Sequence, residues 1–239
     1  MKKRLFTSIF LIACTFGMLK AEDAASNATG FYLATANDSK FCPPFELGWS
    51  TLPSVDYDQY ESDGFMDLDM AKSIMMNITF FGHDIVANPS KTVALSAFMR
   101  FNVNNFVFNS HIRLREDDSE RVIAEPADVK YDKSKLTTMY LDLPIAASFR
   151  LAGKPYGMSV MLAPGIKLNG HSKVKSPKEK EIIHAVRDFR LAVEGRLQVL
   201  PGFYVFGMYD LLPMFKDDKG PDTHALSVGL GLGIPIPEI

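Results

Sequence analysis

Charged residues occupy alternate positions within several apolar segments of the 239-residue sequence. In the segment DFRLAVEGRLQV (188–199), Arg190, Glu194 and Arg196 fall on one face of an extended chain, while Leu191 and Val193 fall on the other. Acids and bases that share an enclosed face can neutralise one another as ion pairs. Ten residues make up this predicted charge network: Glu46, Arg100, Asp142, Arg150, Lys167, Asp188, Arg190, Glu194, Arg196 and Asp210.

Histidines in the longer polar segments could act as general bases if a nucleophile lay within hydrogen-bond reach. The candidates are four histidines with two serines and an aspartate nearby: His111, His171, His184, His224, Ser110, Ser172 and Asp222. Their spacing matches no catalytic signature, and no pair has the HxH or HExxH spacing of a metal site. The sequence therefore predicts no catalytic, metal-binding or cofactor-binding residue, and an enzyme that uses these histidines remains an alternative.

The elements that must position the charged residues are eight predicted strands with period-two alternation. They cover residues 44–53, 70–85, 92–109, 135–150, 155–170, 185–199, 202–215 and 223–235. An even number of strands is required for a closed up-and-down antiparallel barrel. In the last strand, Leu226, Val228 and Leu230 oppose Gly229 and Gly231. Repeated glycine on one face predicts crowding by neighbouring side chains inside a tight barrel.

The connections between these strands alternate in length. Short turns fall at 88–90, 153–155 and 201–202, and longer polar segments at 54–69, 110–134, 171–184 and 216–222. This alternation is typical of transmembrane barrels of the bacterial outer membrane, whose periplasmic turns are short and whose extracellular loops are longer. The fold class predicted is therefore all-β, an eight-stranded antiparallel transmembrane β-barrel.

The width of such a barrel decides which face points outward. Eight strands enclose a lumen only just wide enough to be filled by side chains, so it could not hold all the bulky apolar residues. We expect the apolar faces to meet lipid and the charges to fill the lumen without a wide pore. A soluble periplasmic lipocalin-like barrel with an apolar ligand inside is the alternative, as is a small-solute porin.

Aromatic residues are expected near both strand ends, as in the girdles of membrane barrels. The predicted girdle residues are Phe149, Tyr156 and Phe203 at the turn end, and Phe106, Phe108 and Phe215 at the loop end.

The N-terminal segment has the pattern of a secretory signal peptide. A charged start is followed by an apolar run over 5–19, which is too short to span a bilayer comfortably, and cleavage is expected after Ala21. Leu11-Ile12-Ala13-Cys14 resembles a lipobox, so lipidation at Cys14 is the alternative. Residues 22–43 are then an N-terminal periplasmic lead and 44–239 the barrel domain.

The charge balance and cysteine content of the mature chain exclude other classes. Removing residues 1–21 takes away four positive charges and no negative ones, which changes the net charge from -2 to -6. An acidic exported protein is a poor candidate for nucleic-acid binding. Only Cys42 remains, so no internal disulfide can form.

The segment KVKSPKEKE (173–181) is a run of charges. A solvated surface loop explains it, because Glu179 and Glu181 offset much of the positive charge. The alternative is that Lys175, Lys178 and Lys180 contact lipopolysaccharide phosphates.

Several segments resemble the porin-like outer-membrane β-barrel proteins of Bacteroidetes, the group that includes PorT-like proteins. The matching stretches are FELGWSTL (45–52), KSIMMNITFFGHDI (72–85), RFNVNNFVF (100–108), KSKLTTMYLDLPI (133–145), LAPGIKLNGHSKVK (162–175) and FGMYDLLPMFKDDKGPDTHALSVGLGL (206–232). The resemblance implies a barrel in the bacterial outer membrane and supplies no catalytic residue. The chain departs from the pattern in ending IPIPEI rather than on an aromatic residue, the usual signal for the insertion machinery.

The expected role is structural, adhesive or secretion-associated, performed through the extracellular loops. The expected partners are outer-membrane lipid, lipopolysaccharide, the barrel-insertion machinery and an extracellular or envelope protein, without a cofactor or nucleic acid.

Overall fold

The computed structural model describes residues 45–57, 64–87, 93–126, 133–150, 157–175, 178–200 and 202–232. The predicted signal peptide and the lead over 22–43 lie outside the described residues. The strands are β1 (Phe45–Thr51), β2 (Val55–Asp56), β3 (Ile74–Ala87), β4 (Val93–Val107), β5 (Ile112–Glu116), β6 (Val122–Pro126), β7 (Lys133–Asp142), β8 (Ile145–Arg150), β9 (Gly157–Lys175), β10 (Glu179–Ile182), β11 (Phe189–Leu200), β12 (Phe203–Asp210), β13 (Asp222–Thr223) and β14 (Leu226–Leu232).

Within the described ranges, no helix has the length and apolar character needed to cross a bilayer.

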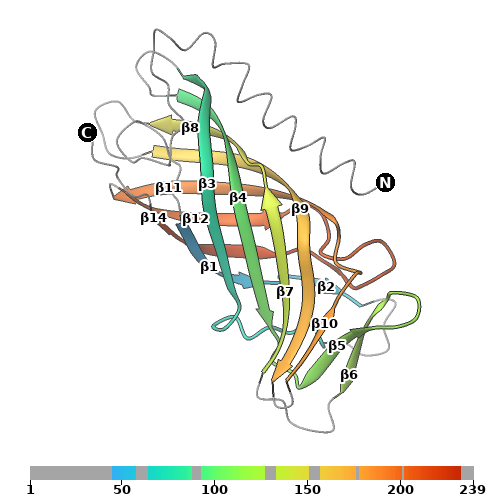
Figure 1. Ribbon diagram of the computed structural model, residues 1–239. Coiled ribbons are helices and arrows are strands. Elements are labelled where there is room, and N and C mark those ends of the chain that lie inside the picture. Colours follow the sequence, from blue (N-terminus) through green and yellow to red (C-terminus); the bar gives the residue numbers. More distant parts are fainter. Residues whose placement is uncertain are drawn as a thin grey trace. The chain divides into compact units, whose positions relative to one another are not determined.

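The long strands form a closed antiparallel barrel (Figure 1). Their order is β9-β11-β12-β14-β1-β3-β4-β7, and β7 pairs with β9 to close the ring. β8 continues the position of β7, because it pairs with the same two neighbours, β4 and β9. The prediction of an all-β barrel with eight antiparallel strand positions is confirmed.

The break between β7 and β8 falls at Leu143 and Pro144. Proline lacks an amide hydrogen and cannot donate to the ladder. The neighbouring strands still hold the break, because Leu143 donates its amide hydrogen to the carbonyl of Pro164 at 2.8 Å and Phe98 donates to the carbonyl of Pro144 at 2.8 Å. The strand predicted over 135–150 therefore corresponds to a single strand position in the barrel, which β7 and β8 fill together.

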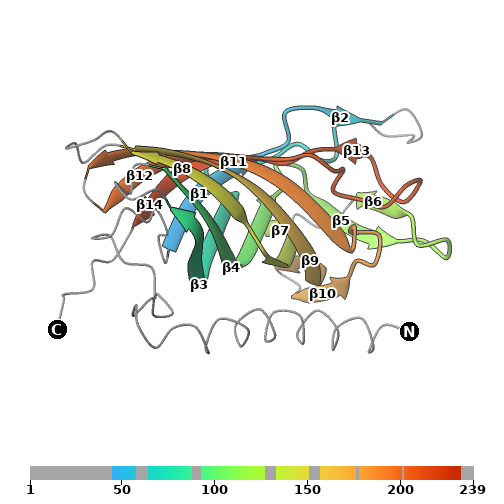
Figure 2. The same ribbon diagram turned by 90° about the horizontal axis from the view of Figure 1, so that it is seen from above.

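The short strands lie at one end of the barrel, which we call the loop end; the opposite end is the turn end (Figures 1 and 2). β5 and β6 pair as a hairpin, β2 pairs with β13, and β10 pairs with the extension of β9. The described parts of the long connections fall at the loop end, so the predicted alternation of short and long connections is confirmed.

The two faces of the barrel wall have opposite character. Along β9, apolar Met158, Val160 and Leu162 are exposed, while Ser159 and Ala163 are buried inside. The other long strands repeat this alternation over most of their described length, and in β3 a bulge between Thr79 and Phe81 leaves both Phe80 and Phe81 exposed. The exposed large apolar side chains on the long strands are Leu47, Trp49, Ile74, Phe80, Phe81, Val93, Leu95, Ile145, Phe149, Met158, Val160, Leu162, Leu168, Phe189, Leu197, Val199, Leu200, Phe203, Val205, Tyr209, Val228, Leu230 and Leu232. We call this surface the apolar band.

An apolar core lies at the loop end, where the short strands meet the barrel. It contains Phe65, Met66, Phe106, Phe108, Ile112, Leu114, Val122, Leu136, Tyr140, Ile183, Ala185, Val186, Met214, Phe215 and Ala225. We call it the loop-end core.

This core corrects half of the girdle prediction. Phe106, Phe108 and Phe215 are at most 5% exposed and belong to the loop-end core. Their position follows from the topology, since Phe106 shares the inner face of β4 and the other two pair in isolated bridges beneath the loops. At the turn end, Phe149 and Phe203 are exposed as predicted; Tyr156 lies outside the described residues.

Candidate functional site

Seven of the ten predicted network residues meet inside the barrel. They are Glu46, Arg100, Asp142, Arg190, Glu194, Arg196 and Asp210, and each is at most 9% exposed. They come from β1, β4, β7, β11 and β12. Because each lies on the inward face of its strand, closing the barrel brings together residues that are far apart in the sequence.

Arg100 lies at the centre of this group. Its guanidinium donates hydrogen bonds to Glu194 and to Asp142, with Nη2 3.2 Å from Asp142 Oδ2. Nη1 also lies 3.4 Å from Glu46 Oε2. One fully buried cation therefore connects carboxylates on three other strands across the lumen.

Arg196 forms the part of the network nearer the turn end. Its Nε lies 2.6 Å from Glu194 Oε1, and its Nη2 lies 2.6 Å from Glu46 Oε1. Its guanidinium also lies 5.2 Å from the centre of the Tyr204 ring, a cation–π distance. Tyr204 in turn donates a hydrogen bond to Glu46 at 2.8 Å.

Arg190 forms the part nearer the loop end. Its Nε donates to Asp210 Oδ1 at 2.8 Å, and its Nη1 lies 3.5 Å from Asp142 Oδ2. Its guanidinium lies 5.5 Å from the centre of the Tyr140 ring. A nearby pocket, partly lined by Phe106 and Asp210, has a volume of only about 10 Å³. That volume is roughly enough for a single water molecule.

The other three predicted residues lie elsewhere. Lys167 Nζ is 2.8 Å from Asp188 Oδ1, and Lys216 Nζ is 3.2 Å from Asp188 Oδ2. This group lies at the loop end, where the side chain of Asp188 is 61% exposed. Partial burial opposes ionisation of Asp188, but the hydrogen bonds from the two lysines outweigh it and lower the pKa of its carboxyl group. The side chain of Arg150 lies outside the described part of the structure.

Neutral partners of the network were missed in the sequence. Asn77 donates to Glu46 Oε2 at 2.6 Å and accepts from Asn102 at 2.6 Å, while the sulfur of Met208 accepts from Arg190 at 3.2 Å. The period of two would have placed Met208 and Tyr204 on the inward face with Asp210. The pattern of charged residues alone gives no signal for these neutral partners.

The histidines have separate surroundings. His184 Nδ1 lies 3.1 Å from Glu116 Oε2, and His224 Nδ1 lies 2.9 Å from the backbone oxygen of Asp210. His171 is buried on β9 and His111 is exposed. Among the described residues, the hydrogen-bond and ion-pair partners of His184 and His224 are carboxylates and a carbonyl, and the His224 ring also stacks on Tyr209 with 5.7 Å between the ring centroids.

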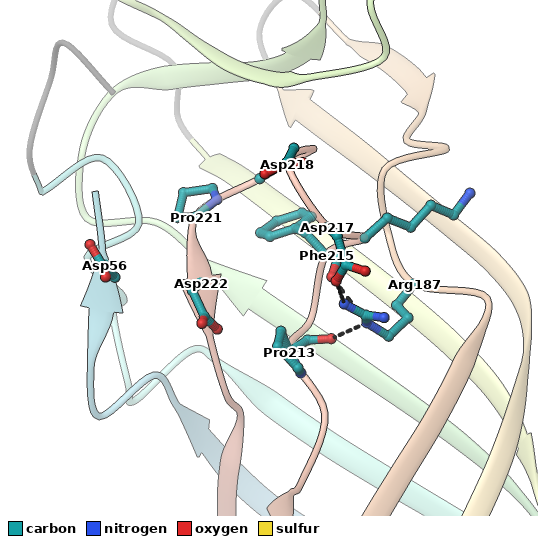
Figure 3. Close-up of a pocket in the computed structure, with 10 residues that line it drawn as sticks. Asp56, Arg187, Pro213, Phe215, Asp217, Asp218, Pro221 and Asp222 are labelled. Carbon is teal, nitrogen blue, oxygen red and sulfur yellow. Dashed lines mark hydrogen bonds and ion pairs between the residues drawn. The ribbon is translucent and has the colours of Figure 1, made fainter. Parts of the chain in front are cut away.

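A pocket of about 350 Å³ opens between the loops that follow β12 and precede β11 (Figure 3). It is lined by Asp56, Arg187, Pro213, Phe215, Lys216, Asp217, Asp218, Gly220, Pro221 and Asp222. Arg187 is committed to structural contacts: its Nε donates to the carbonyls of Pro213 and Phe215 at 3.1 Å, and its Nη2 lies 2.6 Å from Asp217 Oδ1.

The chemistry of this pocket is acidic, because four aspartates line it beside two cations. Within the described residues, no three His, Cys, Asp or Glu side chains are arranged to hold a metal ion. The lumen network and this pocket are thus built from ion pairs and loop-stabilising contacts.

Of the comparisons with known proteins, the comparison with solved structures gives a match. No protein-family model matches the chain, and no curated protein sequence matches it. Among solved structures, the chain is similar to Ail, the attachment invasion locus protein of Yersinia pestis, in its crystal structure with the heparin analogue sucrose octasulfate. The alignment has a TM-score of 0.38 and 13% identity, and covers 80% of this chain and 96% of that chain.

Proposed function

We propose that this protein is an outer-membrane β-barrel that holds a structured set of loops at the cell surface, in a structural or adhesive role. One observation carries the proposal: the barrel wall is apolar where it is exposed and charged where it is buried. Soluble proteins rarely leave an apolar surface of this extent uncovered. Hydrocarbon lipid is the solvent that stabilises such an outer face.

The same observation disfavours the soluble alternative. A lipocalin-like barrel needs an apolar cavity inside and a polar wall outside. Here Arg100, Glu194 and Arg196 fill the position that an apolar ligand would occupy, and each is at most 4% exposed. Moving these charges to a water-facing wall would require every strand to change register by one residue.

The filled lumen favours an anchor over a pore. Three arginines form ion pairs with four carboxylates across the barrel, and the loop-end core lies between them and the loops. An open aqueous channel generally requires about 16 strands. A small-solute porin therefore has less support than an anchor.

The structured loop end supports a role in surface recognition. The β5–β6 hairpin contributes Leu114 and Val122 to the loop-end core, and both are 0% exposed. Loops fixed in this way present a preorganised surface, which lowers the entropy cost of binding. A protein or glycan partner outside the cell and a secretion-associated assembly both fit such a surface. Export through residues 1–21 and membership of the PorT-like group are part of this proposal.

The test combines localisation, folding and conductance. We expect the protein to fractionate with the outer membrane of a Gram-negative host. Its band should migrate differently before and after boiling in SDS, because a folded barrel resists the detergent. Planar bilayers containing the protein should show no large steady conductance. Recovery in the soluble periplasmic fraction would refute the membrane assignment, and stable channels of porin size would refute the filled lumen.

A further inference from the structure

β7, β9 and β10 form a sheet at the loop end (Figure 1). Five lysines share one face of this sheet. Lys133 is the direct partner of Lys175, Lys135 is the direct partner of Lys173, and Lys180 is the direct partner of Lys173 from the other side. Directly opposite residues of antiparallel strands project to the same side of the sheet. We call this surface the lysine face: Lys133, Lys135, Lys173, Lys175 and Lys180.

The lysine face continues the outer wall of the barrel. On β7, Tyr140 and Asp142 are buried on the inward side, whereas Met139 and Leu141 lie on the outward side. Lys133 and Lys135 have the same parity as Met139 and Leu141, so they project outward. The lysines therefore lie on the same outer face as Met139 and Leu141, farther along the strand toward the loop end, with buried Thr137 between the two groups.

The acidic residues of β10 project to the side of the sheet opposite to the lysine face. Glu179 and Glu181 alternate with Lys180 along β10 and pair with Val174 and Ser172, which are buried. Two arginines of β5 neutralise them there. Arg113 Nη1 is 2.5 Å from Glu179 Oε2, and Arg115 Nε is 3.2 Å from Glu181 Oε2.

The lysine face is thus left with like charges close together. Lys133, Lys173 and Lys180 form no ion pair with any other described residue. Lys135 lies directly opposite Lys173 and donates a hydrogen bond to the neutral side-chain oxygen of Asn105. Like charges directly opposite on neighbouring strands destabilise a sheet, so this arrangement costs free energy unless an anion lies against it.

We propose that the lysine face binds the phosphate groups of an anionic glycolipid, lipopolysaccharide, in the leaflet at the loop end. The inference rests on the proposed membrane location and assigns a specific lipid contact to it. The lysines project sideways, in line with the apolar band, into the layer where lipid headgroups lie. A soluble polyanion would be better met by charges on the loop tips, which face away from the bilayer.

The test compares two triple variants of the full chain in detergent micelles and in vesicles. Lys135→Gln, Lys173→Gln and Lys180→Gln together remove the centre of the lysine face. Lys72→Gln, Lys216→Gln and Lys219→Gln change the net charge equally at other loop sites. The probe is diphosphoryl lipid A, with dephosphorylated lipid A as its matched control.

We expect the first variant to bind diphosphoryl lipid A roughly a hundredfold more weakly than the unmodified protein, at about fivefold for each lysine removed. The second variant should bind as the unmodified protein does, and replacing the same three lysines of the lysine face by arginine should preserve binding. In neutral phosphatidylcholine vesicles the first variant should be at least as stable as the unmodified protein, because repulsion has been removed. Diphosphoryl lipid A should reverse that order.

Three results would overturn the inference. The first is that the two triple variants bind diphosphoryl lipid A equally. The second is that the unmodified protein binds dephosphorylated lipid A as strongly as diphosphoryl lipid A. The third is that the lysines bind inorganic phosphate or a sulfated polysaccharide while the protein does not bind lipid A. The shift in gel mobility on boiling is measured on the same samples. A protein that never inserts into vesicles refutes the proposed function, whereas one that inserts without phosphate dependence refutes the lysine face alone.

Discussion

Tyr204 occupies the space that Gly231 leaves empty on the neighbouring strand. The two residues are direct partners across β12 and β14, and both face the lumen. A Cβ atom on Gly231 would lie 1.7 Å from Cζ of the Tyr204 ring. The ring is fixed there because its hydroxyl donates to Glu46 and Arg196 lies over its face. Gly231 is thus required for packing of the lumen.

The first prediction concerns this contact. Gly231→Ala should lower the free energy of unfolding by about 1–3 kcal/mol, because the Tyr204 ring must leave its hydrogen bond. Gly207→Ala is the matched control, since a Cβ there would meet no atom within 4 Å; it should change stability by less than about 0.5 kcal/mol. Urea unfolding in vesicles gives both values. If Gly231→Ala still destabilises as much in a Tyr204→Ala background, the ring is not the cause.

The second prediction concerns the central arginine. Arg100→Met leaves Glu46, Asp142 and Glu194 without their shared cation, so it should cost about 3–5 kcal/mol of stability. Lys72→Met removes an ion pair with Asp69 whose lysine side chain is 65% exposed, and it should cost less than about 1 kcal/mol. Adding Glu194→Gln to Arg100→Met should restore part of the loss. Equal unfolding midpoints for Arg100→Met and Lys72→Met would show that the network contributes little.

The two faces of the barrel wall could be predicted from the sequence, because the alternation of apolar and polar residues depends only on neighbouring positions within one strand. A strand buried on one side and exposed to a single solvent on the other alternates strictly, so Arg196 and Leu197 reveal their faces without knowledge of any partner. The narrow lumen then excluded bulky apolar side chains, which fixed the direction of each face.

The partners inside the barrel could not be predicted in the same way. Arg100 and Glu194 are 94 positions apart, and their contact depends on the stagger between strands that are not sequence neighbours. The period-two alternation also does not show at which residue of a strand the apolar band ends and the loop end begins. Asp188 therefore looked like a lumen residue although its side chain is largely exposed, and Phe106 looked like a girdle residue although loops cover it.

The third prediction concerns acid pH at Asp188. Because the lysines lower the pKa of its carboxyl group in the folded protein, ionised Asp188 stabilises the fold above the unfolded pKa, near 3.8. That contribution is lost as pH falls through the lower folded value. Asp188→Asn should therefore be less stable than the unmodified protein at neutral pH and equal to it near pH 2. Thermal unfolding at the two pH values measures this, and a difference that persists in acid would assign the effect to packing instead.

The fourth prediction concerns the loop-end core. Leu114→Ala removes a fully buried side chain from the β5–β6 hairpin, which should cost about 2–4 kcal/mol of local stability. Trypsin cleavage after Arg121, in the hairpin turn, should then be more than tenfold faster, because cleavage requires local opening. Ile123→Ala, at a partly exposed position of the same hairpin, is the control. The folded band on unboiled gels should persist in both variants, and its loss in Leu114→Ala would mean that the hairpin is part of the barrel's own folding unit.

The fifth prediction separates lipid from water as the solvent of the apolar band. Leu230 on β14 and Met70 in the loop before β3 are both 56% exposed, so a water-soluble protein would tolerate arginine equally at the two positions. In a bilayer, Leu230→Arg places a charge against hydrocarbon and should cost about 2–4 kcal/mol, whereas Met70→Arg at the loop end should cost about 0–1 kcal/mol. Folding yields in vesicles and the midpoints of the boiling-dependent gel shift measure the difference. Equal tolerance of the two arginines would place water on both surfaces, and the exposed leucines and valines of the barrel would then need another protein to cover them.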